Sequence, residues 1–538
     1  MKSQRSRRSG ARALVESLER VGAETVFGYP GGNVIDIFDC ARDAKFRFVL
    51  GRHEQGCVHM ADGYARASGR PGVVLVTSGP GLTNSITGLG VANMDGVPLV
   101  LVCGQVPLDE IGTDAFQEAD TTGLTRAVSK HNFLVKSADE IPETIAQAFY
   151  IATHGKPGVV VIDVPRDCQQ AMTSAEHPAR VSLRAYHPER VASAAQVCRL
   201  AKMLNAAKRP VIYAGGGVIA AEASEDVASL AHKAGIPVVT TMMGIGTMGS
   251  ADPFCLGMAG LHGVPAANRA LKEADFVLAL GMRFNDRTTS ALSRRRQRMA
   301  HVDCDASVIG RNVSVDLGIV ADVKDLLSTV DSRVHPAERG EWLARCRAAR
   351  SDATARRSGR LSAGDVIDAV NRVAKGGEIA VTDVGQHQIW AARRLENLRP
   401  RHFLASGGMG AMGYGIPAAI GAAIARPDRT VVAFVGDGGA QMTSEELVVA
   451  AELGLHVVFI VFENGTLGLV RQMQKEEQGG RIFATDLRSP DFVALAAAYG
   501  VKGVRVDDPA KIDAAIARAI RAKRPFLVDA KIDPEETV

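Results

Sequence analysis

The sequence predicts an α/β protein made of three successive domains, each a parallel sheet covered by helices. Short runs of β-branched residues alternate with helical patterns along nearly the whole chain, which is typical of parallel sheets. The chain has 538 residues and is too long for one hydrophobic core, so two to four domains are expected. Its 55 glycines suit many tight turns between strands and helices.

Composition and charge exclude several classes of protein. A hydrophobic content of 46% and a charged content of 23% are ordinary for a globular protein. The net charge of +4 is small and spread out, so we expect no nucleic acid partner. No apolar run approaches the length of a membrane span. The eight cysteines are scattered without a CxxC pair, which indicates buried thiols and a cytoplasmic location.

The first domain is expected at residues 11–170, after a disordered basic tail at residues 1–10. No apolar segment follows the tail sequence MKSQRSRRSG, so it does not look like a secretory signal. Residues 171–192 lose the alternating pattern and are interpreted as a linker. The strands predicted in this domain are Phe46–Leu50, Gly72–Thr77, Leu99–Cys103 and Val159–Val164.

The second and third domains are expected at residues 193–335 and 363–533. Between them, residues 336–362 are polar and rich in arginine, which predicts a helix and a linker. The strands predicted in the second domain are Pro210–Ala214, Pro237–Thr241, Phe276–Leu280 and Ala300–Val302. Those predicted in the third are Glu378–Val381, Val431–Val435 and Val457–Phe462.

The third domain carries a candidate metal site at the ends of two predicted strands. Asp437 follows one strand within a Gly-Asp-Gly sequence, and Asn464 follows the next. The helical pattern between them, with Thr443 and Glu446 three residues apart, predicts a capping box. Strand, helix and strand form a parallel crossover, so Asp437 and Asn464 should lie side by side. A carboxylate and an amide oxygen suit Mg²⁺ beside a diphosphate, although Asp-Gly and Asn-Gly also form ordinary turns.

The first domain has a second group of candidates. Glu54 follows a predicted strand and precedes a helix, where a carboxylate is either a helix N-terminal charge or a functional acid. The sequence TSGPGLTN at residues 77–84 predicts a helix start open to a polar ligand. Residues 104–120, which include Gln117, form a loop whose length is typical of functional loops.

Long motifs in the same order identify the family that this chain resembles, the acetohydroxyacid (acetolactate) synthase catalytic subunits, which use thiamine diphosphate. The resemblance runs from about residue 10 to the end. The motifs are FGYPGGN (27–33), RHEQG (52–56), HMADGYARASG (59–69), TSGPG (77–81), GQVP (104–107), IGTDAFQEAD (111–120), KHNFLVK (130–136), GMRFNDR (281–287), TDVGQHQIWAA (382–392), SGGMGAMGYGIPAAIGA (406–422) and NGTLGLVRQMQ (464–474).

The resemblance implies three doubly wound parallel-sheet domains: one that binds the pyrimidine of thiamine diphosphate, a central FAD-binding-like domain and one that binds the diphosphate. It implies a homodimer or tetramer, with the active site between the first domain of one subunit and the third domain of the other. A small regulatory subunit is a possible further partner. The implied reaction decarboxylates pyruvate and joins the remaining two-carbon unit to pyruvate or 2-ketobutyrate. The products are 2-acetolactate and 2-aceto-2-hydroxybutyrate, which lead to branched-chain amino acids.

The resemblance also implies residue roles. Glu54 would hydrogen-bond the pyrimidine ring nitrogen, and Met412 would support the bent cofactor. Gln117 and Lys130 would lie near the reacting centre, and Arg283 would meet the acceptor carboxylate. The implied Mg²⁺ ligands are Asp437, Asn464 and the carbonyl of Thr466. The implied thiamine diphosphate contacts are Pro30, Gly31, Gly79, Asn84, Gly385, Gln386, His387, Gly410, Met412, Gly436, Gly438 and Gly439. The implied FAD contacts are Gly215, Gly216, Thr241, Met242, Leu261, His262, Gly281, Arg283, Arg287, Asp303 and Asp322.

Some residues depart from the family pattern. Met473 stands where many members have Trp, which leaves the choice between pyruvate and 2-ketobutyrate open. Asn285 and Lys156 replace the usual Asp and Arg near the flavin, and Glu463 replaces the first Asn of an Asn-Asn pair. The alternatives are a sulfoacetaldehyde acetyltransferase-like enzyme, a pyruvate oxidase-like flavoenzyme and a non-catalytic partner subunit.

Overall fold

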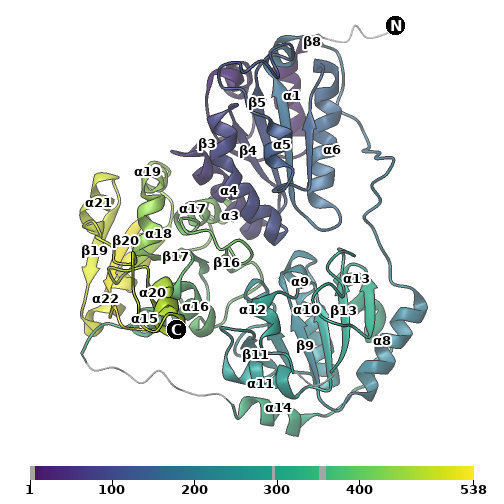
Figure 1. The fold of residues 1–538 in the computed structure, drawn as a ribbon, viewed down its shortest axis with the longest axis vertical. Coiled ribbons are helices and arrows are strands. Elements are labelled where there is room, and N and C mark those ends of the chain that lie inside the picture. The colour runs from purple at the N-terminus through teal and green to yellow at the C-terminus, as the bar shows by residue number, and fades with distance from the viewer. Residues whose placement is uncertain (1–6, 294–296, 350–358) are drawn as a thin grey trace. The chain divides into compact units, whose positions relative to one another are not determined.

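The computed structural model describes residues 7–293, 297–349 and 359–538 and confirms the α/β class. Three six-stranded sheets follow one another along the chain, each made of parallel strands with helices on its faces (Figure 1). The chain divides into two compact units. The first runs to His187 and also includes Gly408–Pro427 and Thr443–Leu455, and the second holds the remainder.

The first unit contains the first sheet. Its strands, in spatial order, are β3 (Arg47–Leu50), β2 (Thr25–Tyr29), β4 (Gly72–Val76), β5 (Leu99–Gln105), β7 (Val159–Pro165) and β6 (His131–Leu134). Its helices are α1 (Gly10–Arg20), η1 (Gly32–Val34), α2 (Ile35–Ala41), α3 (Glu54–Ser68), α4 (Pro80–Asp95), α5 (Thr121–Thr125), η2 (Ala138–Glu140), α6 (Ile141–Thr153), α7 (Arg166–Gln170), α17 (Gly415–Ala425), η4 (Ser444–Glu446) and α19 (Leu447–Glu452). The strands β5 and β7 are buried along their whole length, as expected for central parallel strands covered on both faces.

The predicted tail at residues 1–10 is partly wrong. Residues 1–6 lie outside the described residues, but Arg8–Ser9 form β1, which pairs antiparallel with β8 (Met172–Thr173). Ser9 also caps α1, because its side chain accepts a hydrogen bond from the backbone N–H of Arg12 at 3.2 Å. Ordered structure therefore begins before residue 11.

Helices α3 and α17 pack unusually closely within the first unit. A Cβ added at Gly63 would lie 2.1 Å from the carbonyl oxygen of Ala418, and one added at Gly421 would lie 1.8 Å from that of Met60. Two glycines on facing helices therefore bring the two backbones into contact. The hydroxyl of Tyr414 adds a hydrogen bond of 2.7 Å to Asp62 of α3. Asp62 also pairs with Arg66, which reaches Asp95 at the end of α4.

The second unit contains the other two sheets. The central sheet runs β11 (Cys255–Met258), β10 (Val238–Thr240), β9 (Pro210–Ala214), β12 (Phe276–Leu280), β13 (Arg298–Asp303) and β14 (Leu317–Val320). The helices of this sheet are α8 (Ala194–Ala206), α9 (Gly216–Ala220), α10 (Ser224–Ala234), η3 (Met242–Gly244), α11 (Pro265–Glu273), α12 (Asp286–Thr289), α13 (Val323–Asp331) and α14 (Gly340–Arg347).

The third sheet runs β16 (Phe403–Ala405), β15 (Ile379–Thr382), β17 (Val431–Gly436), β18 (Val457–Glu463), β20 (Phe526–Lys531) and β19 (Lys502–Val506). Its helices in the second unit are α15 (Ala363–Ala374), α16 (Gln386–Arg394), α18 (Asp437–Met442), α20 (Gly468–Glu477), α21 (Phe492–Ala498), η5 (Pro509–Lys511) and α22 (Ile512–Arg521). Every strand predicted from the sequence is present, with ends within two residues of the prediction. None of the described helices is long and apolar enough to cross a membrane.

The capping box predicted at Thr443 and Glu446 is wrong. The Thr443 hydroxyl donates instead to the carbonyl of Gly413 at 3.0 Å, and the helical segment after β17 already begins at Asp437. The Glu446 carboxylate accepts hydrogen bonds from the backbone N–H groups of Arg52 and His53. A partner nearly 400 residues away in the sequence has replaced the local cap.

Candidate active site

Each sheet has a point near its first strand where the strand order reverses. In the first sheet the chain passes from β2 to its neighbour β3 and then returns to β4 on the other side of β2. In the central sheet β10 and β12 flank β9 in the same way, and in the third sheet β16 and β17 flank β15. Ligands of open parallel sheets bind in the crevice outside such switch points, at the carboxyl ends of the strands. All three groups of predicted cofactor residues follow these strands.

At the first switch point, Glu54 is the first residue of α3. Its side chain is only 9% exposed, and its Oε2 accepts a hydrogen bond of 2.9 Å from the amide of Asn84 in the first turn of α4. A carboxylate at a helix N-terminus is stabilised by the free N–H groups of the first turn. The structure thus brings Glu54 and Asn84 together.

Two glycines complete this part of the site. Gly31 follows Pro30 after β2 and packs against Thr77. A Cβ added at Gly31 would lie 2.5 Å from the Thr77 side chain. Gly79 precedes α4 with a φ of +57°, and its Cβ would lie 2.8 Å from the carbonyl oxygen of Gln117. The loop that carries Gln117 therefore packs directly onto the start of α4, close to Asn84.

A buried hydrogen-bond cluster holds both ends of this loop. The Gln105 side chain accepts from the N–H of Val106 at 2.9 Å and donates to the carbonyl of Ala119 at 2.9 Å. It also donates to Asp163 at 3.0 Å, which fixes the direction in which the amide points. Burial raises the pKa of Asp163 to about 7, although hydrogen bonds from Gln105 and Thr121 oppose the shift. Sequence patterns gave no signal for Asp163, because it lies inside a uniformly apolar strand.

The hydrogen bonds described for the Lys130 ammonium go to the end of α6 and not to Glu54, Asn84 or the loop that carries Gln117. Its ammonium donates to the carbonyls of Ile151, His154 and Lys156, at 2.5 to 2.7 Å. These carbonyls belong to the end of α6 and the turn after it, where a cation is favourable. Three hydrogen bonds use the three donors of the ammonium, and the place of Lys130 near the reacting centre stays a prediction.

Met412 and Gly410 lie in the segment just before α17. Gly410 and Gly413 have φ values of +67° and +85°, so the backbone turns sharply on both sides of Met412. Met412 is half-buried, and Met409 beside Gly410 is exposed. Figure 1 shows α17 beside α3, and this packing fixes the segment within the unit that carries Glu54.

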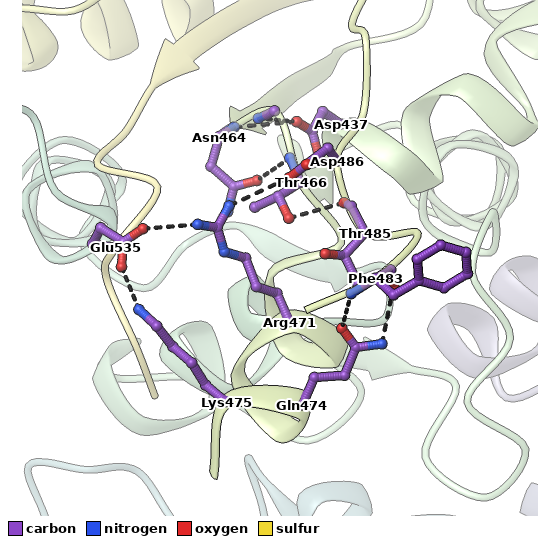
Figure 2. A network of polar contacts seen from close by, with 11 residues as sticks. Asp437, Asn464, Thr466, Arg471, Gln474, Lys475, Phe483, Thr485, Asp486 and Glu535 are labelled. Carbon is purple, nitrogen blue, oxygen red and sulfur yellow. Dashed lines mark hydrogen bonds and ion pairs between the residues drawn. The ribbon is translucent and has the colours of Figure 1, made fainter. Parts of the chain in front are cut away.

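In the third sheet, Asp437 and Asn464 lie side by side, as predicted from the crossover. Strands β17 and β18 are parallel neighbours, with Gly436 opposite Phe462. The Asp437 carboxylate accepts hydrogen bonds from the N–H groups of Gly465 at 2.7 Å and Asn464 at 3.2 Å (Figure 2). The Asn464 side chain in turn accepts from the N–H of Thr466 at 3.1 Å.

Burial raises the pKa of Asp437, while the N–H groups of Gly465, Asn464 and Gly438 oppose the shift. A cation beside this carboxylate would offset the cost of burying its charge. Ser489 lies 3.4 Å from Asp437 and was missed in the sequence, since nothing in its surroundings marks it. No cluster of three His, Cys, Asp or Glu side chains suited to a metal was found in the described part of the chain, so a cation here would need amide, carbonyl and ligand oxygens.

His387 supplies an independent sign of a ligand. It is buried at the start of α16, and its Nε2 has no hydrogen-bond partner. Burial lowers its pKa to about 3, although a hydrogen bond to the backbone of Asp383 opposes the shift, so the imidazole is neutral and its one N–H is used by Asp383. Added Cβ atoms at Gly385 and Gly436 would lie within 2.8 to 2.9 Å of its ring. The glycines therefore make room for a buried imidazole at the switch point, whose Nε2 is left for a ligand.

The side chain of Gln386, a predicted diphosphate contact, is hydrogen-bonded within the protein. Its Nε2 donates to Gln472 at 3.1 Å and to the carbonyl of Glu536 at 3.0 Å. The free backbone N–H groups at the start of α16 are the better anion donors here. Gly438 and Gly439 lie in the first turn of α18, where a Cβ at Gly439 would lie 2.7 Å from the carboxylate of Asp383.

The central sheet presents the predicted flavin residues at its own switch point. Gly215 follows β9 and Gly281 follows β12, with their backbones in close contact. The Arg287 guanidinium lies 3.0 Å from the ring of His262, and the N–H of Leu261 donates to the Arg287 carbonyl. The remaining predicted residues follow neighbouring strands or cap the helices after them: Gly216, Thr241, Met242, Arg283, Asp303 and Asp322. Asn285 and Asp322 are explained locally, since each caps a helix.

The three sheets coincide with three domain families. The chain matches the N-terminal binding domain of thiamine pyrophosphate enzymes over residues 8–124, their central domain over 197–330 and their C-terminal binding domain over 383–530.

Three proteins that are similar to this chain over nearly its whole length are named as acetolactate synthase large subunits. The chain is 42% identical to the acetolactate synthase large subunit of Haemophilus influenzae, over 98% of this chain and 95% of that protein. It is 42% identical to the probable acetolactate synthase large subunit of Methanocaldococcus jannaschii, over 98% and 93%. It is 40% identical to the acetolactate synthase isozyme 3 large subunit of Escherichia coli, over 98% and 96%. The chain therefore belongs to the acetolactate synthase large subunits, a family of thiamine pyrophosphate enzymes.

Proposed function

We propose that this protein is the catalytic subunit of an acetolactate synthase, which decarboxylates pyruvate and joins its two-carbon unit to a second 2-keto acid. The observation that carries the proposal is the pair of intact half-sites: Glu54 with Asn84 in one unit, and Asp437 with Asn464 in the other. Thiamine diphosphate, when bound, supplies the carbon nucleophile and the electron sink that the decarboxylation needs.

The residues of the chain would bind and orient this cofactor. Asp437, Asn464 and the carbonyl of Thr466 would hold Mg²⁺, and His387 would lie beside the diphosphate. Glu54 would share a proton with the pyrimidine ring nitrogen, because a mostly buried carboxylate interacts strongly with one nearby donor. Gln117 would face the reacting atoms, and Arg283 would receive the carboxylate of the acceptor as a bidentate donor.

FAD is proposed for the crevice of the central sheet, from its position at a switch point between Gly215 and Gly281. By analogy with the relatives named as large subunits, a small subunit is a candidate partner, and pyruvate and 2-ketobutyrate are the candidate substrates. A homodimer or tetramer in the cytoplasm is the corresponding assembly.

The test is a competition assay on purified protein with thiamine diphosphate, Mg²⁺ and FAD. Pyruvate and 2-ketobutyrate are supplied together, and both acetohydroxy acids are quantified. Acetolactate formation is expected, and its loss in Glu54→Gln and Asp437→Ala supports the two half-sites. Acetohydroxybutyrate in excess would show that Met473 supports the larger acceptor. Acetyl phosphate or oxygen uptake without acetolactate would contradict the proposal.

A further inference from the structure

Glu446 is a fully buried carboxylate in the first unit that the proposed chemistry does not use. Its two oxygens each lie 3.1 Å from the backbone nitrogen of Arg52, and Oε1 also lies 3.1 Å from that of His53. These two residues directly precede Glu54 in the chain. The N–H groups that lead into α3 are thus satisfied by a carboxylate from a distant segment.

The sequence around Glu54 leaves room for this carboxylate. A Cβ added at Gly56 would lie 2.0 Å from Oε1 of Glu446, so any other side chain at position 56 would displace it. A Cβ added at Gly51 would lie 3.6 Å from the same oxygen. Gly56 therefore makes the recess that holds Glu446, and Gly51 lies in ordinary contact with it.

We propose that Glu446 is a positioning residue, which fixes the backbone at Arg52 and His53 so that Glu54 points at the pyrimidine ring of the cofactor. This inference rests on the proposed function, in which Glu54 is the activating acid. The reasoning is geometric: Glu54 begins the helix, so its direction depends on how the preceding turn is held. Charge-assisted hydrogen bonds from a carboxylate to backbone N–H groups are stronger than neutral ones.

The surroundings support a positioning role over a surface contact. Burial raises the pKa of Glu446 to about 7, and Glu445 adds to this shift, whereas the N–H groups of Arg52 and His53 oppose it. The Arg52 side chain is engaged elsewhere, in an ion pair with Glu452. Glu446 therefore binds the backbone of Arg52, and Glu452 binds its guanidinium. A substitution of Glu452 is the matched control for the same substitution of Glu446.

The experiment measures binding of two cofactors to the full-length protein by calorimetry. One is thiamine diphosphate, and the other is an analogue in which carbon replaces the pyrimidine nitrogen that faces Glu54. Glu446→Gln keeps the side-chain shape but removes the charge and one acceptor. We expect it to weaken thiamine diphosphate binding by roughly tenfold, the scale of one charge-assisted hydrogen bond, and to leave analogue binding within about twofold. Glu452→Gln should change neither affinity.

A general structural defect would weaken both ligands equally, so equal weakening, or none, would overturn the proposal. The apparent melting temperature of each ligand-free variant shows whether it has folded. If Glu446→Gln does not fold, Glu446→Asp is used, and the same selective loss is expected. If the wild-type protein binds thiamine diphosphate but forms no acetolactate, the proposed function is refuted. The comparison of thiamine diphosphate and analogue binding then still tests the role of Glu446. A wild type that binds no thiamine diphosphate would overturn both.

Discussion

The close contact between α3 and α17 predicts a strong effect of a single methyl group. In Gly421→Ala the new Cβ would lie 1.8 Å from the carbonyl oxygen of Met60. Because the carbonyl oxygen belongs to one helix backbone and the Cβ is fixed in place by the other, no side chain can turn away, and the helices must separate by on the order of 1 Å. Overpacking of this kind costs about 1–3 kcal/mol, from which the better helix propensity of alanine removes up to about 1 kcal/mol.

The expected result is a destabilisation of about 1–2 kcal/mol, or a fall in apparent melting temperature of roughly 2–8 °C for a domain of this size. The matched control is Gly340→Ala in α14, where an added Cβ meets nothing within 4 Å. There the same substitution should leave the melting temperature unchanged or raise it slightly. Differential scanning fluorimetry at pH 7 measures both. Since α3 begins with Glu54, Gly421→Ala should also reduce turnover. A melting temperature equal to or above that of the wild type would refute the reasoning.

Two further predictions concern buried polar groups. Asp163 has a folded pKa of about 7 against 3.8 for the free side chain, so the unfolded chain releases this proton first as pH rises. Its carboxyl therefore costs stability progressively from about pH 4 to pH 7, by up to about 4 kcal/mol. Asp163→Asn should remove that loss, and the melting temperature of the variant relative to the wild type should rise from pH 5 to pH 8; an unchanged difference would show that Asp163 does not titrate. Lys130→Met removes a donor from the carbonyls of Ile151 and Lys156, whereas the His154 carbonyl keeps its hydrogen bond from Tyr186, and it should cost about 1–3 kcal/mol. The KM for pyruvate should not change, and a large rise in KM at constant melting temperature would restore Lys130 to the active site.

Much of the fold could be predicted because the informative patterns are local. Apolar runs such as Val457–Phe462 mark buried parallel strands, and the crossover rule alone placed Asp437 beside Asn464. The position of Glu54 between a strand and a helix also followed from the sequence. In each case, residues close in the sequence determine the geometry.

The wrong capping-box prediction and the features that the sequence did not reveal share the opposite cause. Thr443 and Glu446 match a capping box, but the sequence does not reveal that Arg52 and His53 provide better partners for the carboxylate. Lys130 belongs to a family motif, yet which way its side chain points depends on the end of α6. Asp163 is hidden in an apolar strand, and only the tertiary contact with Gln105 shows its role.

The make-up of the first unit constrains how the protein can be cut or recombined. A fragment that ends at His187 would include the whole first sheet, yet it would lack α17 and Glu446. The backbone of α3 around Gly63 would lose its covering helix, and the turn before Glu54 would lose its carboxylate. A chimera that exchanges this domain with a relative must therefore exchange 408–427 and 443–455 with it.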